Sequence, residues 1–302
     1  MRAILSLVLI VASMSCSGGA PWGGASDDPI SVVASFYPLA HAAEQVGEGD
    51  VVVTNLTPPG VEPHDLELTP DDLEVIADAD VVIVARGGFQ PAVEEAVDAV
   101  ATGIVVDVLE GVDLLPPAEA GDGDELDGDP HVWLDPAIYA DIVDRVVTAL
   151  GEAGGAAEGR RFDAAAASFR RRLSALDREF REGLADCGTR VMITNHAAFA
   201  YLAAAYALEQ EPIAGLSPAS EPDPRRIAAL TAEARAAGVT TIFTEDLVSP
   251  EVAETLAAEA GIGTAVLSPL EGLTEEQLAS GDDYMSVMRR NLQTLRDGLD
   301  CA

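Results

Sequence analysis

The chain of 302 residues contains no lysine, four histidines and three cysteines. Its 17 basic residues, all of them arginine, stand against 52 acidic ones, so the formal net charge is -35. This shortage of positive charge opposes binding to nucleic-acid phosphates, which needs a basic surface, and adsorption of the folded surface to anionic lipid headgroups. The excess of carboxylates is typical of a solvated acidic surface, or of a protein that takes a cationic ligand.

The sequence also lacks the motifs of several enzyme classes. It contains no HExxH zinc-protease motif, no GxSxG nucleophile turn and no P-loop. Hydrophobic residues make up 48% of the chain, which is too high for a disordered protein, and the length suffices for one large or two medium domains. We therefore expect a folded protein. Its sequence gives no indication of these hydrolase or nucleotide-binding activities.

The N-terminus begins with Met1-Arg2 and continues into an apolar run over residues 3–12. This run of about 10 residues is too short to span a bilayer of ~30 Å as a helix, and it matches the hydrophobic region of a secretory signal. Cys16 and the Gly/Ser/Ala-rich residues 17–26 follow, an arrangement that resembles a lipoprotein processing site. We predict a signal peptide over residues 1–15, a lipidated Cys16 and a flexible tether over 16–28. The alternative is ordinary signal cleavage, which discards Cys16 and leaves a periplasmic or secreted soluble protein.

Without Cys16 the chain keeps an even pair of cysteines, Cys187 and Cys301. In an oxidising compartment such a pair predicts a disulfide that fixes the C-terminal helix to the second half of the chain. Closing this loop would contribute up to ~4 kcal/mol in the chain-entropy model. Two unpaired thiols are the alternative.

Short β-branched runs alternate with helical segments through two similar halves, which predicts parallel sheets covered on both faces. The expected strands cover residues 30–36, 51–56, 81–85 and 104–108, then 190–194, 211–216, 240–244 and 264–267. The expected helices cover residues 38–46, 70–77, 91–101 and 136–150, then 197–207, 224–236 and 250–260. The predicted fold is α/β, with an N-terminal lobe over 29–155 and a C-terminal lobe over 186–302, each holding a four-stranded parallel sheet.

Between the halves, residues 160–184 carry one apolar stripe at spacings of 7, 4, 3, 4 and 4: Phe162, Phe169, Leu173, Leu176, Phe180 and Leu184. This is the pattern of a long amphipathic helix. We predict a single linker helix over residues 156–185 that joins the two lobes stiffly. From periodicity alone, an ordinary helix inside one large domain is the alternative.

Three of the four histidines lie in loops next to predicted strands and helices. His64 follows the strand that ends at Leu56, His131 precedes a helix, and His196 follows the strand VMIT directly. Ligand-binding groups gather at the carboxyl ends of parallel strands, so three imidazoles from three such loops can meet in one crevice. Neutral imidazole suits Zn²⁺, although intervals of 67 and 65 residues match no compact zinc motif. The alternative is three unrelated loop histidines.

Four segments carry a resemblance to a known family: GVEPHDLELTP, DPHVWLDP, TNHAAFAYLAAAYAL and GDDY. In this order and spacing the chain resembles the zinc/manganese-type solute-binding proteins of ABC transporters over essentially the whole mature sequence. The resemblance implies two α/β lobes joined by one long helix, with the metal in the cleft between them. It assigns His64, His131 and His196 as histidine ligands and Asp282 as the aspartate ligand, with Asp283 as the neighbouring possibility.

Three nitrogens and one carboxylate favour Zn²⁺ over the harder Mn²⁺, and four protein ligands leave no open position for an activated water. The expected function is therefore capture of Zn²⁺ as transported cargo, not catalysis. The expected partner is an ABC permease in the cytoplasmic membrane, to which a monomeric, lipid-anchored protein delivers the metal. A manganese- or iron-binding transporter component and a zinc-dependent hydrolase are the alternatives.

Other polar residues have weaker assignments. The region of residues 119–129 is rich in acids and glycine but has no histidine, and it is a solvated loop or a weak collector of cations. Glu245, at the end of the strand TTIFT, is expected either to bond a ligand imidazole or to be a plain loop carboxylate. We expect His41 to be a surface residue and Trp133 to be a packing residue.

Overall fold

The computed structural model describes residues 28–117, 128–219 and 224–302. The predicted signal peptide, Cys16, nearly all of the tether and most of the acidic loop lie outside these residues. Within the described ranges, no helix has both the length and the apolar character needed to cross a membrane.

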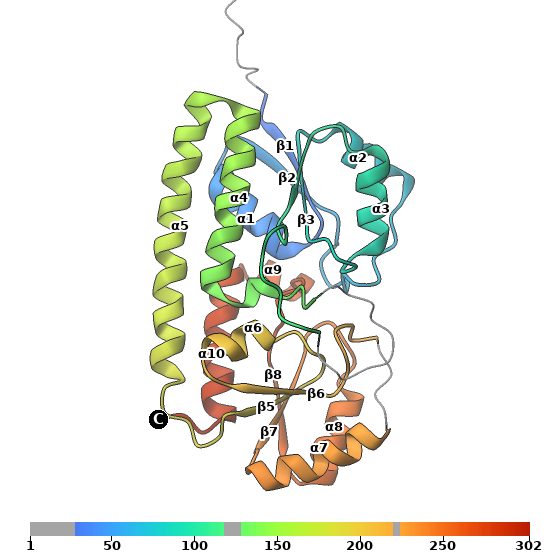
Figure 1. The fold of residues 1–302 in the computed structure, drawn as a ribbon, viewed down its shortest axis with the longest axis vertical. Helices are drawn as coiled ribbons and strands as arrows, with labels where there is room; N and C mark the ends of the chain where they lie inside the picture. The colour runs from blue at the N-terminus through green and yellow to red at the C-terminus, as the bar shows by residue number, and fades with distance from the viewer. Residues whose placement is uncertain (1–27, 118–127, 220–223) are drawn as a thin grey trace, which may run out of the picture.

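The N-terminal half, from β1 to α4, forms the upper part of the molecule in Figure 1. It is built on a parallel sheet in the order β2-β1-β3-β4. Its strands are β1 (Ile30–Ala34), β2 (Val51–Asn55), β3 (Val81–Val84) and β4 (Ile104–Asp107). Helices α2 (Pro70–Asp78) and α3 (Pro91–Val100) cover one face, where they share an apolar cluster with Val33, Val82 and Val84. The opposite face packs on α1 (Tyr37–Gly47) and α4 (Pro136–Gly154). Covering on both faces accounts for the fully buried run Val81–Val84.

The C-terminal half, from β5 to α10, repeats this plan with a parallel sheet in the order β6-β5-β7-β8. Its strands are β5 (Val191–Thr194), β6 (Glu209–Pro212), β7 (Thr241–Thr244) and β8 (Gly263–Val266). Its helices are α6 (Ala200–Ala205), α7 (Pro224–Ala237), α8 (Glu251–Ala260), α9 (Glu275–Ala279) and α10 (Tyr284–Gly298). The prediction of an α/β fold with two four-stranded parallel sheets is confirmed.

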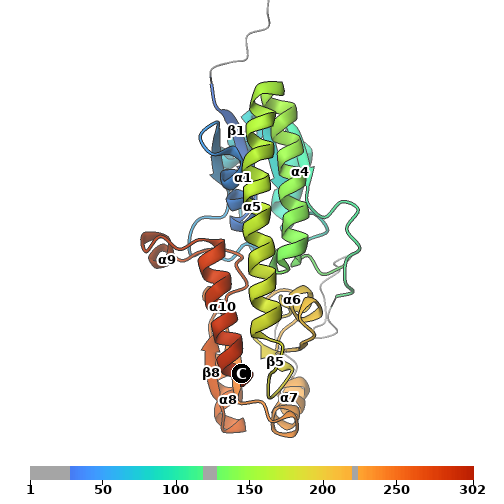
Figure 2. The same cartoon turned by 90° about the vertical axis from the view of Figure 1, so that its left-hand side faces the viewer.

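Helix α5 (Ala156–Gly183) runs along the whole N-terminal half and continues beside the upper part of the C-terminal half (Figures 1 and 2). It lies antiparallel to α4 after a turn at Gly155, whose φ of 87° suits glycine. The five predicted stripe residues within the helix are buried, and they belong to one apolar core that reaches from β1 to α10. The long joining helix is thus confirmed. Its apolar stripe is shared by both halves.

Three local predictions are wrong. The strand expected over 211–216 is β6, Glu209–Pro212, and Ile213 and Ala214 continue as a loop that bonds the end of β5. The helix expected from residue 197 begins only at Ala200, because Ala197 N–H bonds the carbonyl of Gly215 and holds the preceding loop open. His41 is buried on α1, 3% exposed, where Nδ1 lies 3.1 Å from the Tyr139 hydroxyl.

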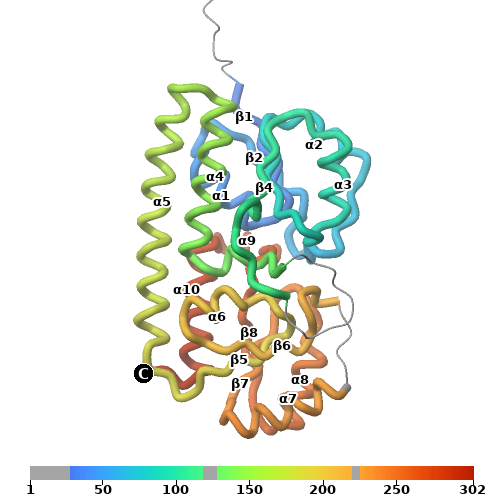
Figure 3. Tube along the Cα trace, in the orientation of Figure 1, coloured from blue at the N-terminus to red at the C-terminus, as the bar shows by residue number. Residues whose placement is uncertain are grey.

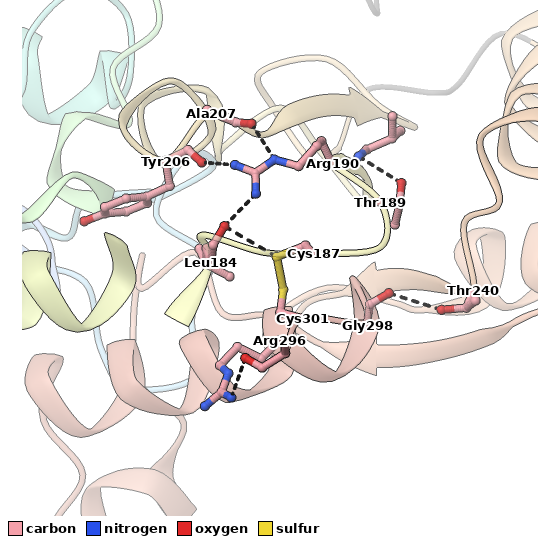
Figure 4. The surroundings of a disulfide bond; sticks show 12 residues. Leu184, Cys187, Thr189, Arg190, Tyr206, Ala207, Thr240, Arg296, Gly298 and Cys301 are labelled. Carbon is pink, nitrogen blue, oxygen red and sulfur yellow. Dashed lines mark hydrogen bonds between the residues drawn. A yellow bond between two sulfur atoms is a disulfide. The ribbon is translucent and has the colours of Figure 1, made fainter. Parts of the chain in front are cut away.

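Cys187 and Cys301 form a disulfide that joins the segment before β5 to the residues after α10 (Figure 4). Arg190 supports the same corner, since its guanidinium donates to the carbonyls of Leu184, Tyr206 and Ala207. Thr240 donates to the carbonyl of Gly298 and ties β7 to the end of α10. The disulfide therefore lies at the amino end of β5, opposite the end that leads to His196.

Candidate metal centre

Four side chains from four loops meet at the junction of the two halves. Their possible ligand atoms all lie within 4.8 Å of one another, and the four residues are His64, His131, His196 and Glu271. Two come from each half: His64 and His131 from the N-terminal one, His196 and Glu271 from the C-terminal one. The side chains of all four are 6% exposed or less. The structure thus brings together all three predicted histidines.

The ends of parallel strands position three of these residues. His64 follows β2, His196 follows β5 and Glu271 follows β8. His131 immediately precedes the 3-10 turn Val132–Leu134 that leads into α4. Figure 3 shows the connection between β8 and α9 running along the junction of the two halves. Because the carboxyl ends of the strands in both sheets point to this junction, the loops that follow them converge there.

Buried contacts hold the His64 loop in place. Gln90, 2% exposed, donates from Nε2 to the carbonyl of Pro63 at 3.2 Å. The ring of Phe89 packs edge-on against the His64 imidazole, with 4.5 Å between centroids. The loop is therefore anchored to the segment before α3 at the residue that precedes the histidine.

The distances from Glu271 to the three imidazoles match the ligand spacing of a tetrahedral zinc site. Glu271 Oε1 lies 3.4 Å from His64 Nε2, 3.1 Å from His131 Nε2 and 3.2 Å from His196 Nε2. Ligands about 2.0–2.1 Å from a tetrahedral Zn²⁺ lie roughly 3.3–3.4 Å from one another. His131 Nε2 is buried and makes no hydrogen bond, although it faces the carboxylate. A buried ring nitrogen that has no hydrogen-bond partner and faces a carboxylate suits a bound cation.

Two further carboxylates orient the imidazoles. Asp129 Oδ1 lies 2.8 Å from His131 Nδ1, and Glu245 Oε1 lies 2.7 Å from His196 Nδ1. Each carboxylate also accepts the backbone N–H of its histidine, at 2.9 Å for His131 and 3.1 Å for His196. With its Nδ1 proton held by a carboxylate, each ring in its neutral form presents the lone pair of Nε2 to the centre.

The charges of the cluster are strongly coupled. Burial alone would raise the pKa of Glu271, but the imidazoles of His196, His131 and His64 hold it well below its usual value. Burial would lower the pKa of His196, yet the carboxylates of Glu245 and Glu271 raise it well above the usual value. The pKa of His131 is raised for the same reason by Asp129 and Glu271. The pKa of His64 is lowered, because burial outweighs its contact with Glu271.

Glu62 lies at the edge of the cluster, and its carboxylate accepts the backbone N–H of His64 at 3.2 Å. Burial, and then the charge of Glu271, raise the pKa of Glu62 to about 8. Its Oε1 is 4.0 Å from His64 Nε2. Glu62 is therefore a neighbour of the cluster and not a member of it.

The structure does not bring Asp282 into the cluster; the carboxylate that it places beside the three histidines is that of Glu271. Asp282 Oδ2 accepts from Arg290 at 2.7 Å, and its Oδ1 accepts from the Ser286 hydroxyl at 3.0 Å. Asp283, the neighbouring possibility, caps α10 by accepting the backbone N–H of Ser286 at 2.7 Å. Both aspartates therefore serve the start of α10.

Sequence reasoning missed Glu271, Asp129 and Glu62. Glu271 lies four residues beyond the predicted strand 264–267, in SPLEGL, so the strand-end rule that singled out His64 and His196 also points to it. Asp129 stands two residues before His131 in DPH, the spacing at which a carboxylate folds back on both the ring and the backbone of the histidine.

Known proteins resemble this chain over most of its length. A family model described as the periplasmic zinc-uptake complex component A, ZnuA, matches residues 32–298. The zinc-binding protein AdcA of Streptococcus pyogenes serotype M6 is 34% identical over 296 residues, which cover 92% of this chain and 57% of that protein. The high-affinity zinc uptake system protein ZnuA of Bacillus subtilis is 32% identical over 306 residues, which cover 98% of this chain and 96% of that protein.

A solved structure shows the same fold. The crystal structure of the Zn(II)-bound ZnuA-like domain of Streptococcus pneumoniae AdcA superimposes with a TM-score of 0.77 at 34% identity. The match covers 90% of this chain and 99% of that domain. The chain spans 57% of the length of the AdcA relative, so it corresponds to one part of that longer protein.

Proposed function

This chain belongs to the ZnuA family of zinc-uptake components, and from that premise we propose that it captures Zn²⁺ and delivers it to an ABC permease. The observation that carries the proposal is the cluster itself. Three imidazole nitrogens lie 3.1 to 3.4 Å from one carboxylate oxygen, which is the ligand spacing of a tetrahedral zinc ion. The proposed ligands are His64, His131, His196 and Glu271.

The donor set favours Zn²⁺ over Mn²⁺ and Fe²⁺. Imidazole is a borderline donor that suits zinc, whereas manganese prefers sites rich in oxygen. Asp129 and Glu245 strengthen this preference, because a carboxylate on Nδ1 makes Nε2 more basic. A manganese- or iron-binding role would require these metals to displace zinc in competition.

The proposed activity is binding and release, without catalysis. With three histidines and Glu271 as ligands, a tetrahedral zinc ion has no open position for an activated water. A zinc-dependent hydrolase needs such a position, so this set of four ligands also opposes that alternative.

We place the protein outside the cytoplasm, in line with the periplasmic description of the family model. The finer assignment is a signal peptide over 1–15 and a lipid anchor on Cys16, with residues 16–28 as the tether to a monomeric binding protein. The anchor is supported by a relative described as a zinc-binding lipoprotein, AdcA of Streptococcus pneumoniae, which is 35% identical over 285 residues. Metabolic labelling with a radioactive fatty acid tests the anchor, since label that persists in Cys16→Ser would overturn it.

The zinc assignment is tested with protein purified without an affinity tag. We expect metal analysis to give one zinc per chain. We expect a zinc titration to change the fluorescence of Trp133, whose ring centroid lies 5.2 Å from that of His131. His196→Ala should abolish stoichiometric zinc binding. His41→Ala is the matched control, because it removes the other buried histidine, which is outside the cluster. Full affinity in His196→Ala would refute the assignment.

A further inference from the structure

The backbone that carries Glu271 is in an unfavourable conformation. Leu270, directly before it, has a φ of 56°, in the left-handed region that leucine rarely adopts. Leu270 is fully buried and belongs to the apolar core shared by the two halves. A strained residue of this kind persists only where its surroundings fix the conformation, and such residues concentrate at functional sites.

Buried hydrogen bonds fix the turn from Ser268 to Glu271. Asn291 on α10, 2% exposed, makes two of them with Ser268: its Oδ1 accepts the backbone N–H at 2.9 Å, and its Nδ2 donates to the carbonyl at 2.7 Å. The hydroxyl of Ser268 accepts the N–H of Leu270 at 3.3 Å. The turn is therefore held from within the C-terminal half on the side of α10.

The third anchor comes from the N-terminal half. The indole Nε1–H of Trp133 donates to the carbonyl of Pro269 at 2.8 Å, across 136 residues of sequence. Trp133 is fully buried, and its own carbonyl accepts the hydroxyl of Tyr284 at 2.7 Å. One short segment thus holds the ligand His131 and, two residues later, the side chain that fixes the turn of Glu271.

We propose that Trp133 is a positioning residue for Glu271: its indole N–H, together with Asn291, holds the strained turn Ser268–Glu271 in the conformation that presents the carboxylate to the three histidines. This inference rests on the proposed function and deepens it. Without the hydrogen bond to Pro269, Leu270 is free to relax toward negative φ, and that relaxation moves the carboxylate of Glu271 away from the Nε2 atoms. The indole then contributes to metal affinity through a bond and not merely through its bulk.

The test compares Trp133→Phe with the wild type by competition against a zinc chelator. Phenylalanine keeps an aromatic ring in the core but removes the N–H. We expect zinc affinity to fall by about 10- to 100-fold, the usual effect of losing a residue that orients a ligand. Tyr139→Phe is the matched control, because it removes a buried hydroxyl that donates to the carbonyl of Pro38 at 2.7 Å, outside the site. It should keep wild-type affinity.

Trp133 also contacts His131, so a double mutant must separate the two routes. In a Glu271→Ala background, Trp133→Phe should change zinc affinity by no more than about twofold, because its effect acts through Glu271. The same loss in both backgrounds would overturn the proposal and place the effect on His131 or on the fold. Unchanged affinity in the single variant would overturn it as well.

Hydrogen exchange of the metal-free protein gives a readout that needs no zinc. Trp133→Phe should accelerate amide exchange over residues 268–273, whereas Tyr139→Phe should not. If Trp133→Phe does not fold, Trp133→Met takes its place, since it also removes the indole N–H that bonds Pro269 while its flexible side chain fills the core. Unchanged exchange would refute the positioning role. If Trp133→Phe accelerates the exchange but the wild-type protein binds no zinc, the positioning role stands and only the proposed function is refuted.

Discussion

Glu245 and His196 face each other across 2.7 Å in the C-terminal half, and the same carboxylate oxygen accepts the backbone N–H of His196. One side chain thus fixes both the tautomer of the ring and the position of the loop that carries it. Glu245 is 6% exposed, so water does not compete for this contact.

Glu245→Gln should weaken zinc binding by about 10-fold, because the amide can still accept one hydrogen bond but no longer makes His196 Nε2 more basic. Competition against a chelator measures the change. Glu251→Gln, on the exposed start of α8, is the control and should bind as the wild type does. Equal affinities for Glu245→Gln and Glu251→Gln would contradict the role of Glu245.

Glu271→Ala and Asp282→Ala should have very different effects on zinc affinity. Loss of the buried carboxylate of Glu271 should cost about 3 kcal/mol of binding free energy or more, roughly a hundredfold in Kd. Asp282→Ala removes an ion pair with the half-exposed Arg290, worth at most about 1 kcal/mol of folding stability, and it should leave zinc affinity unchanged. The opposite ranking would restore Asp282 as the ligand.

Zinc binding should release protons at neutral pH. In the metal-free protein, neighbouring carboxylates raise the pKa of His131 and His196 above the usual value of about 6.5, so protons compete with zinc for these imidazoles up to a higher pH than usual. Affinity should therefore keep rising as pH increases through 7. Calorimetry at pH 7 in buffers of different ionisation enthalpy measures the release. Heats that do not depend on the buffer would rule it out.

His41 should make the metal-free protein sensitive to acid. Burial lowers the pKa of His41 to about 4, partly offset by the charge of Asp283, so the unfolded chain binds this proton more readily than the folded one. Above pH 6.5 the burial of neutral His41 does not lower the free energy of unfolding. As pH falls from 6.5 toward 4, the unfolded chain takes up the proton first, and the free energy of unfolding decreases by up to about 3 kcal/mol. Urea unfolding of wild type and His41→Phe between pH 7 and 4.5 should show a shallower decline for the variant. Parallel declines would contradict this.

Removal of the disulfide should affect stability but not binding. The double variant Cys187→Ser/Cys301→Ser should lose about 2–4 kcal/mol of unfolding free energy, because the unfolded chain is no longer constrained. Zinc affinity should stay at the wild-type value, since the disulfide lies at the amino end of β5 and His196 follows its carboxyl end. A matching loss of affinity would show that the two ends of the sheet are coupled.

The sequence predicted the sheets, the linker helix and the three histidines because each leaves a local pattern. Strands show β-branched runs, the helix shows an apolar stripe, and the histidines follow strand ends. Glu271 was missed because carboxylates are abundant in a chain with 52 of them, so one more acid after a strand does not stand out. The chain has only four histidines, so each histidine near the end of a strand is conspicuous.

Tertiary contacts determine the features that the sequence did not reveal, such as the burial of His41 and the backbone conformation of Leu270. His41 lies on a helix in a sequence context that does not reveal its burial. It is enclosed by Tyr139, Phe169 and Tyr284, which come from three other helices. The strained φ of Leu270 likewise depends on Trp133, 137 residues away in the chain, and no local pattern contains that information.

The disulfide closes residues 187–301 into a covalent ring that contains β5 to α10. A single proteolytic cut within this ring would open it without separating its pieces. His196 and Glu271 both lie inside the ring, whereas His64 and His131 lie on the chain that leads into it. A molecule nicked once in its C-terminal half would therefore keep all four proposed ligands in one covalent unit.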